Sequence, residues 1–338
     1  MFRREWLQIA GKLAAGSMAS LFVLDANLSG ASQKMRRTAL SSRAMGTRIN
    51  VTGFGDREDV RSVLEGAIRE IDTIDRLMTI HRDDSDLTVA NRSGGRSGKP
   101  DPMTLEVARE SLAIASLTGG ALDPTILPLM QIWGFTGPTK WALESHIEAV
   151  VDRVGYRSVQ VTDDRILLEG DRQIDFGSIA KGYGVDQAVG RAITDGIQNV
   201  MVEAGGDLYA AGRPEPDRRW TIGVRDPERP SRLFATIDVE NEAVATSGGY
   251  EKFRVFDGRK VPHILDPRTG HPAQGTISAT IVAPTTMQAD ALSTATFVLG
   301  IDAAMDLISS IPEVEGLWVD ADGRRWMTQG LKRRVQFV

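Results

Sequence analysis

Cysteine is absent from this chain of 338 residues. Its absence excludes disulfide bonds, thiolate catalysis, cysteine-ligated zinc and a lipid anchor on an N-terminal cysteine. Histidine is also rare, with four residues, so few imidazoles can serve in acid–base chemistry. A chain without cysteine is compatible with an oxidising compartment but does not require one.

The sequence also lacks the excess of basic residues that is typical of nucleic-acid-binding proteins. The net charge is −5 and the pI is near 5.6, so we expect no nucleic-acid partner. Hydrophobic residues make up 41% of the chain and charged residues 25%, as in ordinary globular proteins. The length is sufficient for a large core in one domain or two.

The N-terminus has the pattern of an export signal. Arg3 and Arg4 precede a weakly apolar run over residues 9–24, which Lys12 interrupts, and small residues follow at 29–31. A basic segment, a modest apolar segment and a small-residue cleavage site typify a secretory signal, and paired arginines indicate the twin-arginine route. The short, charged run argues against a membrane span. A cytoplasmic amphipathic helix is the alternative, although no acidic stripe continues a helix beyond the run.

These patterns predict a periplasmic protein, with membrane contact only through the signal or a partner. The signal is either cleaved or kept as an anchor. The predicted organisation is an export signal over residues 1–31, a linker over 32–40 and one domain over 41–338.

Helix-like and strand-like segments are mixed along this domain without a regular βαβ repeat. Apolar residues at helical spacing predict helices, and short alternating runs predict strands. The predicted helices cover residues 59–80, 104–117 (with Thr104 as its cap), 185–197 and 287–299. The predicted strands include residues 46–53, 159–161, 166–168, 200–209 and 276–282, with a hairpin at 320–323. This mixture indicates an α+β fold rather than a doubly wound sheet.

The segment from Asp175 to Asp186 is the most informative part of the sequence. It places three glycines and Lys181 between a strand-like run and a helix-like run. Glycines let the backbone turn tightly beside a ligand, and backbone N–H groups with a lysine can bind phosphate. The spacing matches neither of the two common nucleotide-binding motifs. A plain strand–turn–helix connection is the alternative.

Two further groups contain residue types that suit metal and acid–base chemistry. Asp290 and Thr294 are four residues apart on a predicted helix, so they share a face and could bind a hard cation such as Mg²⁺. Asp290 could instead cap a turn or pair with an arginine. His263 ends a strand just before Asp266, and it could be a general base, a phosphate ligand or a structural histidine.

Glycine pairs and a polar turn complete the candidate sites. Gly205-Gly206 and Gly248-Gly249 each follow a strand-like run. Such pairs let the backbone approach a flat or phosphorylated ligand, and tight hairpin turns explain each pair about as well. Asp123 lies in a polar turn that it could fix as an Asx turn.

Taken together and in order, these segments resemble the ApbE-type FAD:protein FMN transferases. The resemblance covers about residues 40 to 335. Leu122 stands where the family usually has phenylalanine, which removes an aromatic contact but leaves Asp123 in place. The matching segments are Met45–Thr47, Ser85–Asn91, Gly120–Thr125, Asp175–Asp186, Glu203–Asp207, Thr246–Tyr250, His263–Gly270 and the helix with Asp290.

The resemblance implies an α+β, T-fold-like architecture with the nucleotide in a cleft between two lobes. It implies that Asp290 and Thr294, with a main-chain carbonyl of the loop that begins at Ser178, hold Mg²⁺. His263 would be the base, and Lys181 would act with Asp290 in catalysis. The residues implied to bind FAD are Met45, Gly46, Thr47, Asp123, Lys181, Glu203, Gly205, Gly206, Asp207, Ser247, Gly248, His263, Arg268 and Thr269.

The implied reaction moves FMN from FAD to a threonine hydroxyl of a partner protein and releases AMP. The implied partner is an acceptor flavoprotein subunit of a membrane or periplasmic redox system. An FAD pyrophosphatase, with water as the acceptor, and an exported flavin-binding or metal-binding carrier are the alternatives. An NADH–flavin oxidoreductase is not expected, because no dinucleotide fingerprint follows a strand.

Overall fold

A computed structural model describes residues 21–23, 35–55, 58–136, 142–256 and 258–338. Most of the predicted export signal, and the linker up to residue 34, lie outside these residues. Within the described part, no helix combines the length and the apolar character needed to cross a bilayer.

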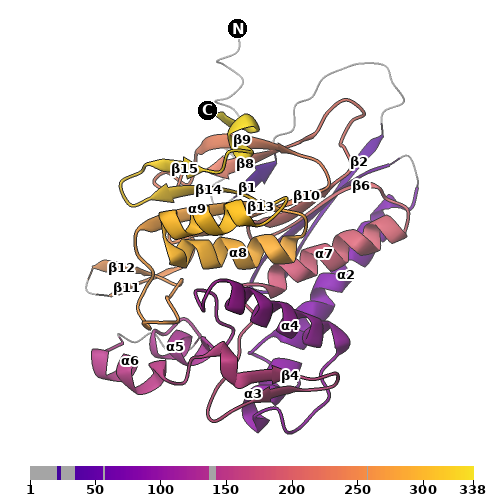
Figure 1. Ribbon diagram of the computed structural model, residues 1–338. Coiled ribbons are helices and arrows are strands. Elements are labelled where there is room, and N and C mark those ends of the chain that lie inside the picture. The colour runs from indigo at the N-terminus through magenta and orange to yellow at the C-terminus, as the bar shows by residue number, and fades with distance from the viewer. Residues whose placement is uncertain (1–20, 24–34, 56–57, 137–141, 257) are drawn as a thin grey trace.

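An eight-stranded antiparallel sheet forms the centre of the fold (Figure 1). From one edge to the other, its strands are β15 (Arg325–Met327), β14 (Glu315–Asp320), β13 (Thr276–Ala283), β10 (Glu242–Gly248), β7 (Asp207–Ala211), β6 (Asn199–Ala204), β3 (Thr47–Gly55) and β2 (Arg36–Ala44). Ile49 of β3 pairs with Ala204 of β6, so segments about 150 residues apart in the sequence lie side by side in this sheet.

Different layers cover the two faces of the sheet. Four helices pack on one face: α2 (Val60–Met78), α7 (Ala180–Thr194), α8 (Thr286–Leu299) and α9 (Ile301–Ser310). A second sheet covers the other, with the order β1 (Leu21–Val23), β8 (Trp220–Arg225), β9 (Leu233–Val239) and β16 (Val335–Phe337). Alternate residues of a strand point to opposite faces, so Ala245 packs toward the helices whereas Val244 packs toward the second sheet.

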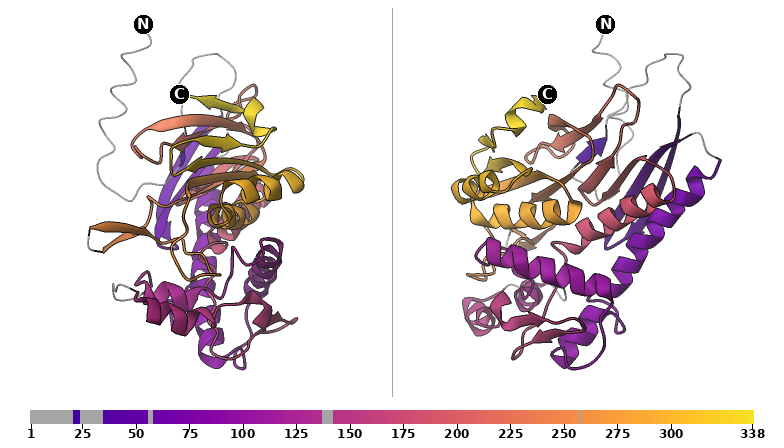
Figure 2. Two further views of the ribbon diagram at one scale, coloured as in Figure 1. Left: turned by 60° about the vertical axis from the view of Figure 1, so that its left-hand side comes forward. Right: turned by 45° about the vertical axis from the view of Figure 1, so that its right-hand side comes forward.

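Smaller elements lie below the helical layer in Figure 1 and connect α2 to α7. A separate hairpin projects from the body. Figure 2 shows α2 and α7 side by side along the edge of the molecule. The smaller elements are α3 (Asp86–Ser93), α4 (Pro102–Leu117), α5 (Leu127–Ile132), α6 (Glu144–Val151), β4 (Val159–Val161) and β5 (Ile166–Leu168), and the separate hairpin is β11 (Phe253–Phe256) with β12 (Arg259–Pro262).

The α+β class predicted from the sequence is confirmed. The predicted helices 59–80 and 287–299 correspond to α2 and α8, and the predicted strands 46–53 and 276–282 correspond to β3 and β13. These elements have long apolar patterns, because they are buried along one whole face or more.

Other boundaries differ from the prediction. Residues 36–40, predicted as linker, belong to β2, an edge strand whose side chains alternate between exposed and partly buried and so give little apolar signal. Leu21–Val23, within the predicted export signal, pair with β8. The predicted strand 200–209 is two strands, β6 and β7. Asp101 rather than Thr104 caps α4, since the Asp101 carboxylate accepts from the Met103 N–H at 2.9 Å.

Candidate active site

Helices α7 and α8 pack closely where Gly182 faces the start of α8. A Cβ atom at Gly182 would lie 2.3 Å from the carbonyl oxygen of Thr286, so no larger residue fits without movement of the backbone. One turn later, the Asp186 carboxylate accepts hydrogen bonds from the N–H groups of Thr286 at 2.8 Å and Met287 at 2.9 Å. It therefore caps α8 from a neighbouring helix. Burial raises the pKa of Asp186 to about 6.

The glycines of the predicted phosphate loop have a different role from the one predicted. Gly182 and Gly184 lie inside α7, and neither they nor Gly177 has a positive φ. A Cβ atom at Gly184 would lie 3.4 Å from Sδ of Met45. These two glycines thus permit close packing of α7 against its neighbours, and the predicted loop is largely the N-terminal part of that helix.

This packing brings Lys181 to two buried carboxylates. Its Nζ donates to Oδ1 and Oδ2 of Asp290 at 2.9 and 3.0 Å and to the carbonyl oxygen of Gly177 at 3.1 Å, and it lies 3.0 Å from Oδ2 of Asp207. Burial opposes the lysine charge, but the two carboxylates outweigh it and raise the Lys181 pKa far above its usual value. Burial and the nearby Asp290 raise the pKa of Asp207 above its usual value.

The residues predicted to bind a metal lie beside this lysine. Oδ2 of Asp290 also accepts from the Gly182 N–H at 3.0 Å. Oγ1 of Thr294 is 3.1 Å from Oγ of Ser247, at the end of β10. The loop carbonyl that contacts Lys181 belongs to Gly177, the neighbour of the predicted Ser178. Helix α8 therefore contributes the Asp290 carboxylate and the Thr294 hydroxyl to one place, and β10 contributes the Ser247 hydroxyl.

The donor set suits a hard cation. Carboxylate, hydroxyl and carbonyl oxygens are the ligands that Mg²⁺ prefers. Across the described ranges, no group of three or more histidine, cysteine, aspartate and glutamate side chains could hold a metal. A cation here would accordingly depend on Asp290, with hydroxyl and main-chain oxygens, rather than on a dedicated all-carboxylate cage.

Two tight turns lie next to α7. Gly205 and Gly206 connect β6 to β7 with φ values of 61° and 102°, which only glycine adopts readily. A Cβ atom at Gly205 would lie 2.6 Å from Oγ1 of Thr47, so this turn contacts the start of β3, directly after the turn at Met45-Gly46. Glu203 holds the turn, since its Oε1 accepts from the Gly206 N–H at 2.9 Å. Burial raises the Glu203 pKa.

The first turn, Met45-Gly46, joins β2 to β3. Both residues are left-handed, with φ values of 52° and 69°, as in the two-residue hairpin turns that match strand twist. This conformation is strained for methionine. The Met45 N–H donates to Oδ2 of Asp75 in α2 at 2.9 Å and thereby stabilises the turn.

His263 belongs to the same electrostatic neighbourhood. Its N–H donates to the carbonyl oxygen of Lys252 at 3.0 Å, and its Nδ1 is also 3.0 Å from that oxygen. Burial, with the positive charges of Lys252 and Lys181, lowers the His263 pKa to about 4. The imidazole is therefore neutral at pH 7. If Nδ1 carries the proton toward the Lys252 carbonyl, Nε2 can accept another.

Glu251 and Lys252 are site residues that the sequence reasoning missed. Burial and the charge of Asp207 raise the pKa of Glu251 to about 8, and Lys181 and Lys252 partly oppose this rise. Both residues are therefore close to the lysine–carboxylate group. The available signal was their position just after the Gly248-Gly249 pair, from which Tyr250 separates them.

Asp123, Arg268 and Thr269 have partners other than Lys181. The Asp123 carboxylate accepts from the N–H groups of Thr125 and Tyr156, both at 2.8 Å, so it fixes an Asx turn. Asp266 binds the Arg268 guanidinium through two hydrogen bonds of 2.8 Å. The exposed Thr269 accepts from the His271 N–H. None of these contacts joins these residues to Lys181.

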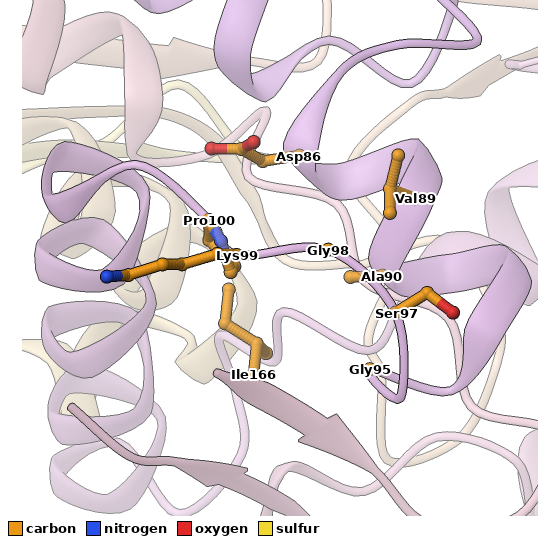
Figure 3. Close-up of a pocket in the computed structure, with 9 residues that line it drawn as sticks. All are labelled: Asp86, Val89, Ala90, Gly95, Ser97, Gly98, Lys99, Pro100 and Ile166. Carbon is orange, nitrogen blue, oxygen red and sulfur yellow. The ribbon is translucent and has the colours of Figure 1, made fainter. Parts of the chain in front are cut away.

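A small pocket lies next to α3. It has a volume of about 100 Å³ and is lined by residues that include Asp86, Val89, Lys99 and Ile166. In Figure 3 the Lys99 side chain extends away from the other labelled residues. The Asp86 carboxylate accepts from the Asp101 N–H and the Thr104 hydroxyl, at 2.8 and 2.6 Å. The pocket is smaller than sites for drug-sized ligands, and it is not a candidate FAD site.

Comparisons with known proteins agree with this architecture. The model of the ApbE family matches residues 45–318. The FAD:protein FMN transferase of Haemophilus influenzae is 30% identical to the chain, with coverage of 88% of this chain and 90% of that protein. The FAD:protein FMN transferase of Treponema pallidum is also 30% identical, with 91% of each chain covered.

Solved structures agree as well. The crystal structure of the ApbE protein from Thermotoga maritima matches with a TM-score of 0.84 and 32% identity, over 88% of this chain and 99% of that one. The flavin transferase ApbE from Vibrio cholerae matches with a TM-score of 0.79 and 27% identity, over 89% of this chain and 99% of that one.

Proposed function

The chain belongs to the ApbE family, and from this we propose that it is an enzyme that transfers FMN from FAD to a threonine hydroxyl of a partner protein. The observation that carries the proposal is the contact of Lys181 with Asp290 and Asp207, beside the Ser247 and Thr294 hydroxyls. The ammonium group of Lys181, held in place beside oxygen ligands for a metal ion, can neutralise the negative charge of a pyrophosphate.

The reaction exchanges the phosphoanhydride bond of the FAD pyrophosphate for a phosphoester bond to threonine. The threonine oxygen forms a bond to the phosphorus of the FMN half, and the bond from this phosphorus to the bridging oxygen breaks. The electron pair of that bond leaves with AMP. Lys181 stabilises the negative charge that develops on the phosphate oxygens. Asp290 and Thr294, with a main-chain oxygen near Gly177, would hold Mg²⁺, which would supply further charge neutralisation when bound.

The threonine proton must also be removed, and we assign this role to His263. Its low pKa keeps the ring neutral at pH 7, so a ring nitrogen can accept a proton. No covalent enzyme intermediate is needed, because the threonine hydroxyl itself serves as the nucleophile. Water in the place of threonine would give FMN and AMP, which is the pyrophosphatase alternative.

The test is an incubation of the protein with FAD, Mg²⁺ and a purified acceptor domain that carries a target threonine. We expect a fluorescent adduct on a denaturing gel, an added FMN mass on threonine and release of AMP. The threonine-to-valine acceptor is the matched control. Free FMN and AMP without an adduct would indicate a pyrophosphatase, and intact bound FAD would indicate a carrier.

We also propose that the protein works in the periplasm, on an acceptor subunit of a membrane or periplasmic redox system. The support is the arginine pair followed by an apolar run near the N-terminus. Replacement of Arg3 and Arg4 by lysine should retain the protein in the cytoplasm, as measured by fractionation of cells. Unchanged periplasmic recovery would contradict the twin-arginine route.

A further inference from the structure

Among the residues that the structure describes, the hairpin of β11 and β12 is a two-stranded sheet that pairs with neither larger sheet, and it extends to the left of the body in Figure 1. Phe253 pairs with Pro262, and Val255 pairs with Lys260. Because side chains alternate between the faces of a strand, these four residues share one face, which we call the outer face. The residues between them share the inner face.

The inner face packs against the body. Val261 is buried in an apolar cluster with Leu129 and Trp133, and Phe256 packs against this cluster. Nη2 of Arg254 donates to the carbonyl oxygen of Gly134 at 3.0 Å. These contacts hold the hairpin in one orientation, so the direction of its outer face is fixed.

The outer face carries large apolar side chains that do not contribute to any core. Phe253 is 38% exposed and Val255 is 57% exposed, two residues apart on one strand. Nζ of Lys260 lies 4.8 Å from the centre of the Phe253 ring. An aromatic ring with an adjacent cation and an exposed β-branched residue is the composition of an interface anchor rather than of an ordinary solvated strand.

The charge of the hairpin is opposite to that of the whole protein. Residues 252–262 contain four basic residues and one acidic residue, a local charge of +3, whereas the chain has a net charge of −5. Of the basic residues, Lys260 lies on the outer face, Arg254 lies on the inner face, and Lys252 precedes the hairpin. Such a local patch attracts an acidic surface over about 10 Å at ordinary salt. The partner that suits this face therefore combines carboxylates with an apolar side chain.

The hairpin is also continuous with the candidate active site. His263 directly follows β12, and its N–H and Nδ1 both lie 3.0 Å from the carbonyl oxygen of Lys252, the residue just before β11. The two ends of the hairpin thus meet at the imidazole. A protein bound to the hairpin therefore lies next to the chain segment that carries this ring.

We propose that the outer face of this hairpin is the docking surface for the acceptor protein, which presents carboxylates and an apolar side chain beside its target threonine. The inference rests on the proposed function and specifies the partner surface of that same site. It assigns Phe253, Val255 and Lys260 to acceptor binding and not to FAD chemistry.

The experiment compares the wild type with F253S/V255S and with K260E. The matched control is L117S, which changes a side chain that is 50% exposed at the end of α4. Initial rates of adduct formation are measured against the concentration of the acceptor domain. FAD cleavage without acceptor and the thermal midpoint are measured in parallel, to show that each variant is folded and has an intact site.

We expect the acceptor KM to rise about tenfold in F253S/V255S, as for loss of an interface anchor. The KM for FAD, cleavage without acceptor and L117S should not change. K260E should raise the acceptor KM mainly at low salt, because salt screens exposed charges.

An acceptor KM that is unchanged in both hairpin variants would overturn the inference while leaving the proposed function intact. If the wild type cleaves FAD but modifies no acceptor, the proposed function fails, and the docking role fails with it. Sedimentation with vesicles of phosphatidylcholine and phosphatidylglycerol tests a lipid surface. Vesicle binding that the hairpin variants lose, with an unchanged acceptor KM, would assign the hairpin to the membrane instead.

Discussion

Asp290 and Asp123 are both buried carboxylates that the sequence associates with ligand binding, yet their partners differ. Asp123 accepts hydrogen bonds from two backbone N–H groups and from the hydroxyl of Thr125 within its own region. Asp290 holds the side chain of Lys181, which is 109 residues away in the sequence. A carboxylate satisfied by backbone fixes a loop, whereas a carboxylate that holds a side-chain cation near hydroxyls can exchange partners with a ligand. Burial alone does not distinguish these two roles.

The largest effect should come from Asp290→Asn, which removes the charge and keeps the shape. We expect flavin transfer to fall at least about a hundredfold, because Lys181 loses a partner and the cation site loses its carboxylate. The thermal midpoint should also fall, because the buried Lys181 loses a charged partner and the amide cannot accept every hydrogen bond that Asp290 accepts. Initial rates with saturating FAD, together with Mg²⁺ titration by calorimetry, test this. Full transfer at low Mg²⁺ would show that Asp290 resembles Asp123 after all.

Gly182→Ala should be the most damaging change to stability. The new Cβ atom would meet backbone atoms of Thr286 and Met287, so we expect a loss of about 3 kcal/mol in the free energy of unfolding. Transfer should fall as well, because the same contact positions Lys181. Urea unfolding provides the measurement, with Gly190→Ala as the control, since that position has open space for a Cβ atom. Equal stability of the two variants would contradict the packing argument.

Asp123→Asn tests the role of Asp123 in fixing its loop. The amide cannot accept from both Thr125 and Tyr156, so we expect a loss of about 2 kcal/mol in the free energy of unfolding. The transfer rate of the folded protein should stay within a few fold of the wild type. Urea unfolding and active-site-normalised rates give the two values. A large fall in rate with unchanged stability would place Asp123 at the flavin nucleotide.

The effect of Asp186 should be visible mainly as a dependence on pH. Its pKa is raised to about 6 in the folded chain from an ordinary value of 3.8, so the folded state binds the proton more tightly than the unfolded state. The contribution is fully present below pH 4 and is lost as pH rises through 6. Between pH 4 and 7, wild type should lose more stability than Asp186→Asn, by on the order of 2 kcal/mol. Parallel curves for the two proteins would refute the assignment.

The sequence predicted the fold class and the long helices because their apolar periodicity is local. It also pointed to Lys181, Asp290, Thr294 and His263, whose segments the structure brings together. It did not predict that Asp186 caps α8 or that Gly182 serves packing, since both depend on a helix about 100 residues further along the chain.

The sequence also failed to predict short elements and charged residues that are close only in the folded chain. The edge strand β2 has too little burial for a clear apolar pattern. Glu251 and Lys252 look like ordinary surface charges in the sequence, and only the folded chain shows that they lie near Asp207 and Lys181. The sequence pattern therefore could not show which residues of different segments lie close together in the fold.

The short strand β1 has a practical consequence for protein maturation. Within the described residues, β8 lies between β1 and β9, and β1 forms the edge of this sheet. A signal peptidase that cut after residue 31 would remove Leu21–Val23 and leave the backbone of residues 222–224 without this partner strand. Open edges recruit strands from other chains. Removal of the signal would therefore leave β8 as an exposed edge strand. Storage of the mature protein at high concentration should then favour edge-to-edge oligomers.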